Sequence, residues 1–409
     1  QPEESRIFAT HFLLNNIMQG IKNLTQGPIN KQLFNLAMPI MATSFIQMAY
    51  SLTDMAWVGR LGSEAVAAVG SVGILTWMSG SISLLNKVGS EVSVGQSIGA
   101  QNHEDARNFA SHNITIALII SLCWGGLLFL LARPIIGIYE LEAHITDNAV
   151  TYLRIVSTAL PFVFLSAAFT GIYNASGRSK TPFYISGTGL VMNILLDPLF
   201  IFGFGWGIRG AAVATVLAQI IALVWQFRIL SDKRELLHFR RGIYRLRKKI
   251  VRDMLAIGMS PFLMNLAACF IVILINKGLK EYGGDLMIGA YGIVNRLAFF
   301  FVMIVMGINQ GMQPIAGYNF GARQYDRVLR VLRLTIIGAT CVTGAGFLMG
   351  ELAPRLAVSA FTNDPELIRL AVEGMRIVFV CFPIIGFQMV ATNFFMSIGM
   401  AGKIGRAHV

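Results

Sequence analysis

Charged residues are scarce in this sequence. Asp, Glu, Lys and Arg make up 13% of its 409 residues, against 55% for hydrophobic residues, and the mean hydropathy is +0.63. This balance excludes an ordinary water-soluble domain. The short alternating strands of a membrane β-barrel are missing, and the apolar residues instead gather in runs of about 20, the length of a transmembrane helix. The sequence therefore predicts an all-α polytopic membrane protein.

Patterns typical of enzymes and metal sites are missing too. The four cysteines lie singly in apolar runs, and His112 and the other histidines show no metal-ligand spacing. The sequence has no HExxH or paired catalytic aspartate motif. Its net charge of +12 is concentrated in a few loops, as in a membrane protein with basic cytoplasmic loops. We therefore expect no enzyme activity, no cofactor and no nucleic-acid partner.

Ten apolar runs follow one another along the chain. Their approximate bounds are 34–58, 65–86, 109–131, 149–173, 182–204, 208–230, 254–279, 286–312, 334–350 and 367–395. A stretch with nine Lys and Arg between Lys233 and Arg252 separates the first six runs from the last four. Basic loops alternate with acidic ones, and basic loops remain in the cytoplasm, so the N-terminus is predicted to be cytoplasmic.

The two parts of the chain are sequence repeats. At a constant offset of 222, the matches are Gly62 with Gly284, Ala68 with Ala290, Gly95 with Gly317, Gly99-Ala100 with Gly321-Ala322, Arg154-Ile155-Val156 with Arg376-Ile377-Val378, Pro161 with Pro383, and Gly177 with Gly399. Repeats with an even number of spans have the same topology, and an axis along the membrane normal relates them, with the substrate site between the halves. The sequence thus predicts two parallel six-helix lobes around a central cavity.

This repeat predicts a second lobe that is shorter than the first. The counterparts of runs 182–204 and 208–230 would lie beyond residue 409, so we expect the last two helices of the second lobe to be missing and the chain to be inactive. The tail Ile404–Val409 corresponds to a common sequencing adapter read in frame, and we expect it to be non-native. The predicted segments are a cytoplasmic N-terminal segment 1–32, an N-lobe 33–231, a basic linker 232–253, an incomplete C-lobe 254–403 and the tail 404–409.

Two carboxylates lie inside apolar runs of the first repeat, Asp54 and Asp197. A carboxylate near mid-membrane costs about 2.5–3.5 kcal/mol on insertion scales, so such a residue is a functional-site hypothesis. Asn193 lies four residues before Asp197, on the same helix face. Pro198 has no N–H for the carbonyl of Ile194 and disfavours helical geometry at Asp197. The pattern predicts a broken helix whose oxygens suit a hard cation or a proton. The alternatives are a structural carboxylate at Asp197 and an interfacial, snorkelling one at Asp54.

Four sequence blocks carry a resemblance to a known family. They are LTQGPI before the first run, SLTDMAWVGRLGSEAVAAVG at its end, GQSIGAQN, and NILLDPLFIFGFGWGIRGAAVATVLAQ. Over about Leu24–Lys403 the sequence resembles transporters of the MATE (multidrug and toxic compound extrusion) family, in the bacterial branch with the DinF-like exporters. The resemblance implies two six-helix lobes and export of amphipathic or cationic compounds in exchange for H+ or Na+.

The resemblance also implies a cation site in the N-lobe. Carried over by motif, the site consists of Asp54, Asn193, Asp197, Thr215 and Tyr152. Gln47, two turns before Asp54, matches a position that lines the substrate cavity. Some relatives have a carboxylate in the seventh helix, but run 254–279 has none, and the repeat partner of Asp54 is Asn276. Coupling through the C-lobe is therefore not expected.

Lys87 and Glu91 form another polar pair, in the predicted cytoplasmic half of the second run; their repeat partners are Asn309 and Gln313. One interpretation is an intrahelical ion pair near the interface, and the other is a polar inner gate where the lobes meet.

The overall prediction is a monomeric secondary multidrug antiporter of the bacterial inner membrane, with small amphipathic or cationic substrates. The alternative is a flippase of lipid-linked precursors, which should have a more cationic cavity. A channel or a purely structural protein would not need buried carboxylates beside a proline.

Overall fold

The structure is a computed structural model that describes residues 22–230 and 245–400. Within these ranges the chain is α-helical apart from loops and one π-helical turn, and it contains no β-strand there. Residues 1–21, 231–244 and 401–409 lie outside the described part, and with them most of the predicted N-terminal segment, part of the basic linker and the whole predicted tail.

Seven α-helices and the π-helical turn make up the N-lobe. They are α2 (Ile29–Gly59), α3 (Ser63–Gly99), α4 (His103–Leu130), α5 (Ala132–Gly137), α6 (Ala143–Ala175), α7 (Lys180–Pro198), the π turn η2 (Leu199–Gly203) and α8 (Gly207–Leu230). All except the short α5 correspond to apolar runs that are long enough to cross a membrane, with η2 continuing the span of α7. Helix α2 begins directly after Pro28, four residues before the predicted start of the lobe, because proline cannot donate to a preceding turn but fits the start of a helix.

The C-lobe begins with a long, interrupted helix. Helix α9 (Lys248–Gly321) turns at Gly284, whose φ of 68° is a backbone conformation that favours glycine. We call Lys248–Gly284 its first limb and Leu286–Gly321 its second limb. The lobe continues with α10 (Tyr325–Leu352), α11 (Pro354–Ser359), α12 (Pro365–Phe379) and α13 (Phe382–Ser397), the last two forming one span bent by 49°. The described residues thus contain the ten predicted spans, and Lys248–Asp253 of the predicted linker form the first turns of α9.

The helix boundaries of the two lobes follow the sequence repeat. Helices α4, α5 and α6 begin at residues 103, 132 and 143, and α10, α11 and α12 begin 222 positions later. The unusual backbone conformations recur as well, with φ of 58° at Gln101 and 59° at Arg323, and 72° at Gly177 and 75° at Gly399. The predicted repeat is therefore a repeat of structure, and both lobes run through the membrane with the same topology.

Helix starts are stabilised by polar caps in the loops. The side chain of Asn102 accepts a hydrogen bond of 3.1 Å from the backbone N–H of Asp105 at the start of α4. Asp364 accepts one of 2.9 Å from the backbone N–H of Glu366 at the start of α12. Such caps satisfy N–H groups that the first helical turn leaves without partners, so they fix the residue at which each of these helices starts after its loop.

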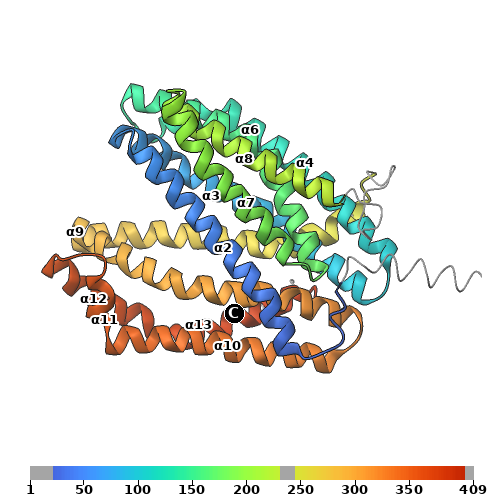
Figure 1. Ribbon diagram of the computed structural model, residues 1–409. Coiled ribbons are helices and arrows are strands. Elements are labelled where there is room, and N and C mark those ends of the chain that lie inside the picture. The colour runs from blue at the N-terminus through green and yellow to red at the C-terminus, as the bar shows by residue number, and fades with distance from the viewer. Residues whose placement is uncertain (1–21, 231–244, 401–409) are drawn as a thin grey trace, which may run out of the picture.

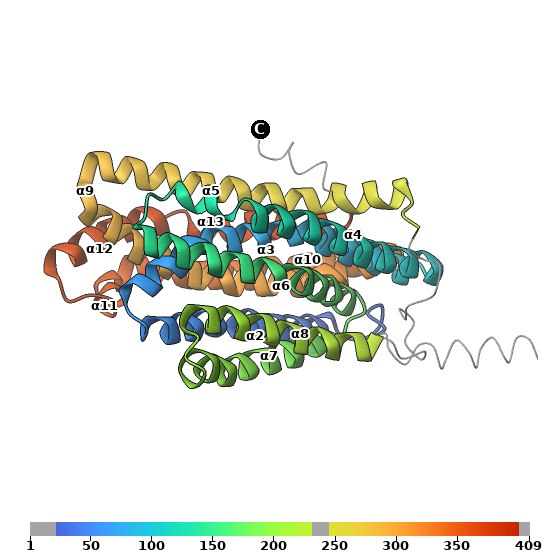
Figure 2. The same cartoon turned by 90° about the horizontal axis from the view of Figure 1, so that it is seen from above.

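The two lobes meet at one end of the bundle and diverge toward the other (Figure 1), and seen from above their helices run in nearly the same direction (Figure 2). We call the end where they meet the basic end, because its loops carry Arg178, Lys180 and Arg323. There the backbones touch. A β-carbon on Gly99 would collide with the carbonyl of Tyr318, and one on Gly321 with the carbonyl of Gln96. Since Gly321 and Tyr318 are the repeat partners of Gly99 and Gln96, the contact is reciprocal, as a twofold-related interface requires.

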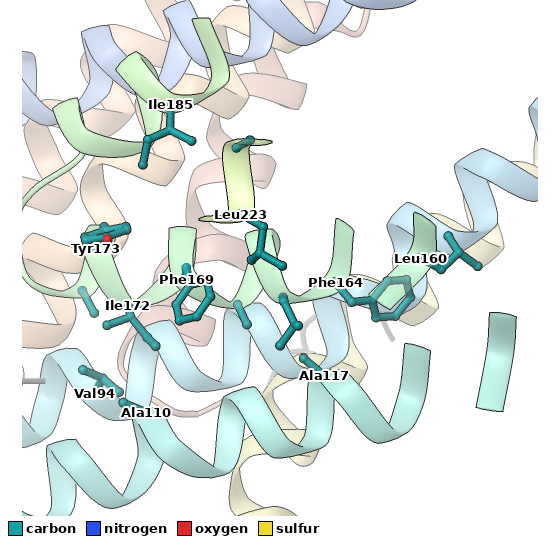
Figure 3. Close-up of a cluster of buried hydrophobic side chains, with 14 of the residues drawn as sticks. Val94, Ala110, Ala117, Leu160, Phe164, Phe169, Ile172, Tyr173, Ile185 and Leu223 are labelled. Atoms are coloured by element: carbon teal, nitrogen blue, oxygen red, sulfur yellow. The ribbon is translucent and has the colours of Figure 1, made fainter. Parts of the chain in front are cut away.

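Helix α6 forms the centre of the N-lobe (Figure 3). Its large side chains Phe164, Phe169 and Tyr173 are at most 1% exposed and pack against the neighbouring helices. The Tyr173 hydroxyl donates a 3.3 Å hydrogen bond to the carbonyl of Gln226 in α8. Close-packed aromatic side chains resist displacement. The N-lobe core is therefore a firm support for the helices that carry the predicted cation-site residues.

Candidate functional site

Asp197 and Pro198 lie at the junction of α7 with η2. The sequence predicted a helix broken at Asp197, and this prediction is wrong: α7 continues through Pro198, whose φ and ψ are −63° and −31°. The turn that follows, Leu199–Gly203, is a π turn, which is wider than an α-helical turn. The N–H of Phe204 donates a 2.9 Å hydrogen bond to the carbonyl of Leu199, five residues back, whereas in an α-helix the bond goes four residues back. Single π turns of this kind are frequent at functional sites.

The widened turn packs directly against the start of α8. A β-carbon on Gly210 would lie 2.6 Å from both the carbonyl carbon and the carbonyl oxygen of Phe200, closer than real β-carbon contacts. Only glycine permits this approach without displacing η2. The contact brings α8, and with it Thr215, beside the end of α7.

Asn193 and Asp197 form a fully buried pair on α7. Both side chains are 0% exposed, and the Asn193 amide donates a 2.9 Å hydrogen bond to one carboxylate oxygen of Asp197. Their remaining side-chain oxygens, Oδ1 of Asn193 and Oδ2 of Asp197, have no hydrogen-bond partner. A buried carboxylate without a full set of donors is costly, so these two oxygens are suited to a further ligand.

Other helices direct polar groups to the same place. Asp54 interacts electrostatically with Asp197, and buried Tyr152 of α6 interacts with both carboxylates. Asp54 Oδ1 and the Thr215 hydroxyl are buried atoms without a hydrogen-bond partner. The structure thus brings together the five predicted site residues from α2, α6, α7 and α8. Their oxygens form the hard donor set that suits an alkali cation or a proton.

Tyr50 and Gln219 also belong to this cluster, and the sequence analysis missed both. Tyr50 lies beside Thr215 and Gln219 of α8 and interacts with Asp54 and Asp197. The sequence contains a spacing that points to each of them: Tyr50 precedes the predicted site residue Asp54 by four residues, and Gln219 follows the predicted site residue Thr215 by four. Residues four apart share a helix face, so the faces of the predicted residues could have identified both.

Gln47 and Asn276 are the other residues that the sequence analysis named on the first span of each lobe. Gln47 is exposed on α2, on the lobe's surface, while Asn276 is half-buried on the first limb of α9. The exposed position of Gln47 is compatible with its predicted place on a cavity wall.

The predicted gate residues lie in two polar clusters, one in each lobe. Glu91 is 3% exposed, faces Lys87 and Asn174, and leaves its Oε1 without a partner. Among the described residues no salt bridge within 4 Å joins it to Lys87, although the two side chains interact electrostatically, so both interpretations of the pair stay predictions.

In the C-lobe, Gln313 donates a 3.4 Å hydrogen bond to Asn393 of α13. Asn309 is 1% exposed, and neither its amide nitrogen nor its oxygen has a partner. The contacts that the structure shows for these residues lie within a single lobe. A gate formed across the lobes stays a prediction.

Comparison with known proteins identifies the family. The family model MatE matches residues 39–199 and 258–403, the greater part of the chain. This chain belongs to the MatE family. Its members are transporters and need no cofactor, so the chain is a multi-pass membrane transporter and not an enzyme. The family that the sequence motifs resembled is thereby confirmed.

Relatives and solved structures agree with this assignment. The chain is 28% identical over 344 residues to "Probable multidrug resistance protein YoeA" of Bacillus subtilis, covering 81% of this chain and 73% of that protein. It is 27% identical over 361 residues to "Probable multidrug resistance protein NorM" of Thermotoga maritima, covering 86% and 76%. A crystal structure of MATE in the bent conformation superposes with a TM-score of 0.88 at 22% identity, covering 93% and 85%. The predicted fold class is confirmed.

Proposed function

We propose that this MatE protein is a secondary active exporter that exchanges amphipathic or cationic small molecules for H+ or Na+. The observation that supports it is the pair of carboxylates in the N-lobe, fully buried Asp197 and half-buried Asp54, with Asn193, Thr215, Tyr152 and Tyr50 around them. Two carboxylates in a low-dielectric site repel each other unless a proton or a cation neutralises them. Binding of a cation or a proton relieves this repulsion, and the relief is greatest when the carboxylates lie close together, so occupancy depends on the shape of the site.

Helix α2 connects this site to the other lobe. Asp54 and Tyr50 lie near its end, and at its other half Ala37 and Met41 press against Gly311 and Gly307 of the second limb of α9. A cation that draws Asp54 toward Asp197 reorients α2 and so alters the fit between the lobes and the cavity in the N-lobe. Because the cation binds the two arrangements with different affinity, its binding drives the switch.

The orientation of the protein follows from its charges. Basic loops remain in the cytoplasm, so the basic end, where the lobes meet, faces the cytoplasm, and the diverging end faces outward. In this orientation the protein lies in a bacterial inner membrane in an outward-facing state, with its N-terminus on the cytoplasmic side. Exposed Gln47 contributes to the cavity wall, and the clusters at Glu91 and Gln313 regulate closure at the basic end.

The experiment that tests this function compares Asp197→Asn with the wild-type protein, expressed in efflux-deficient cells loaded with ethidium. The amide keeps the shape of the side chain and can still accept from Asn193, so only the charge is lost. The matched control is Asp147→Asn on α6, an exposed carboxylate whose ion pair with Arg133 contributes little.

We expect Asp197→Asn to abolish active efflux and Asp147→Asn to leave it intact. Removal of Na+ and addition of an uncoupler then identify the coupling ion. Undiminished efflux in Asp197→Asn would contradict the proposed site. A wild-type protein that exports no cationic dye, but moves lipid-linked precursors across the membrane, would instead establish the flippase.

A further inference from the structure

The segment Lys22–Pro28, which precedes α2, lies against both lobes at the basic end; we call it the N-terminal strap. On the N-lobe side, the backbone N–H of Lys22 donates a 3.1 Å hydrogen bond to the carbonyl of Ser176, just after α6. Leu24 is 3% exposed and packs beside Gly177. A short irregular segment with a buried leucine is anchored, because releasing it would expose apolar surface.

On the C-lobe side, Arg327 of α10 clamps the strap. Its guanidinium donates to the carbonyls of Gly27 at 2.9 Å and Leu24 at 3.2 Å. The same group donates to Gln32 Oε1 at 3.1 Å and to Asn319 Oδ1 at 3.0 Å. The flat, always charged fork of arginine suits such simultaneous bonding, and lysine, with a single ammonium, cannot reproduce it.

Asn319 completes the clamp from the second limb of α9. It is 0% exposed, and its amide donates 3.1 Å and 2.8 Å hydrogen bonds to the carbonyls of Leu24 and Ile315. With its oxygen bound by Arg327, every polar atom of the side chain is used. A buried and fully bonded asparagine holds its partners in one geometry.

The strap is bonded to α2 and to the N-lobe, so its bonds to Arg327 and Asn319 are the ones that cross to the C-lobe. Gln32, in the first turn of α2, donates to the carbonyl of Gln26 in the strap, and its N–H bonds to the carbonyl of Pro28 at 3.2 Å. These local bonds join strap and helix into one unit. Any motion that parts the lobes at the basic end therefore has to break the bonds to the C-lobe.

We propose that the N-terminal strap and the clamp of Arg327 and Asn319 form a latch that holds the basic end closed and releases when that end opens. The latch stabilises the arrangement of the lobes in which the basic end is closed, and it does so without contacting the coupling ion. It binds by several charge-assisted bonds rather than by apolar surface, and such bonds can open to water and re-form.

Spin-label distances between the lobes test the latch in the purified protein in lipid nanodiscs, without substrate and without Na+. Glu104 and Asp326 are each replaced by cysteine and carry the spin labels; they are exposed repeat partners at the basic ends of α4 and α10. The native cysteines are replaced by serine; they are Cys123, Cys269, Cys341 and Cys381. The test variants are Arg327→Gln and Arg327→Lys. The matched control is Arg330→Gln, an exposed arginine one turn further along α10.

We expect Arg327→Gln to raise the ratio of open to closed distances at the basic end at least about tenfold, which corresponds to about 1.4 kcal/mol. Arg327→Lys should raise it by a smaller factor, and Arg330→Gln should leave it unchanged. Equal distance distributions in Arg327→Gln and Arg330→Gln would overturn the latch, as would a lower melting temperature without any change in distance. Since all variants are compared at one pH and without Na+, the coupling site is in the same state in each. Failure here therefore leaves the Asp197 site standing, and failure of that site leaves the latch standing.

Discussion

Gly210 is the position where a single methyl group should disturb the cation site without touching any of its ligands. In Gly210→Ala the new β-carbon would lie 2.6 Å from the Phe200 carbonyl, whereas ordinary contact begins at 3.4 Å. The obstacle is backbone, which cannot rotate away, so η2 and α8 have to separate by about 0.8 Å, the difference between these two distances. Overpacking of this kind costs about 1–3 kcal/mol.

This separation should weaken cation binding. Thr215 lies on α8 and Asp197 at the end of α7, so a shift between these helices lengthens the distances between ligand oxygens. Metal–ligand distances tolerate only about 0.2 Å. If the strain is relieved by retreat of η2, a cost of about 1–3 kcal/mol corresponds to about a 5- to 150-fold loss of affinity.

The assay measures the concentration of the coupling cation that gives half-maximal ethidium uptake into inverted vesicles. The matched control is Gly189→Ala on α7, where the new β-carbon meets Ala222 at an ordinary 3.9 Å. We expect the half-maximal concentration to rise in Gly210→Ala and to stay unchanged in Gly189→Ala. If both variants behave like the wild type, the argument that the π turn positions the site is refuted.

Two further predictions concern the basic end. Gly99→Val should obstruct the contact with the carbonyl of Tyr318, so that a cysteine introduced at a buried position of this end becomes accessible to thiol reagents. Gly95→Ala, with open space around it, should leave that cysteine protected. Equal labelling of the cysteine in the two variants would contradict the close contact. Glu91→Gln should slow efflux several-fold if Glu91 acts in the inner gate, since removing a buried charge alters closure, and an unchanged efflux rate would dispose of the gate hypothesis.

The sequence alone determined the spans and their repetition. Apolar runs of membrane-spanning length have few folded solutions other than helices, so the length and composition of run 109–131 were enough to predict the helix α4. The offset of 222 then related α4 to α10 and α5 to α11. The buried position of Asp197 followed in the same way, because a carboxylate inside an apolar run has few places to lie.

The tertiary structure decided which contacts form between segments that are distant in the sequence. Pro198 alone predicted a break, but α7 continues through it into a π turn that packs against Gly210. Tyr50 joins the site because α2 and α8 lie side by side there. Arg327 reads in the sequence as one more basic loop residue, yet it bonds to Gly27, 300 residues away. Such contacts depend on how side chains from distant segments pack, and one-dimensional patterns of hydropathy and charge do not contain that information.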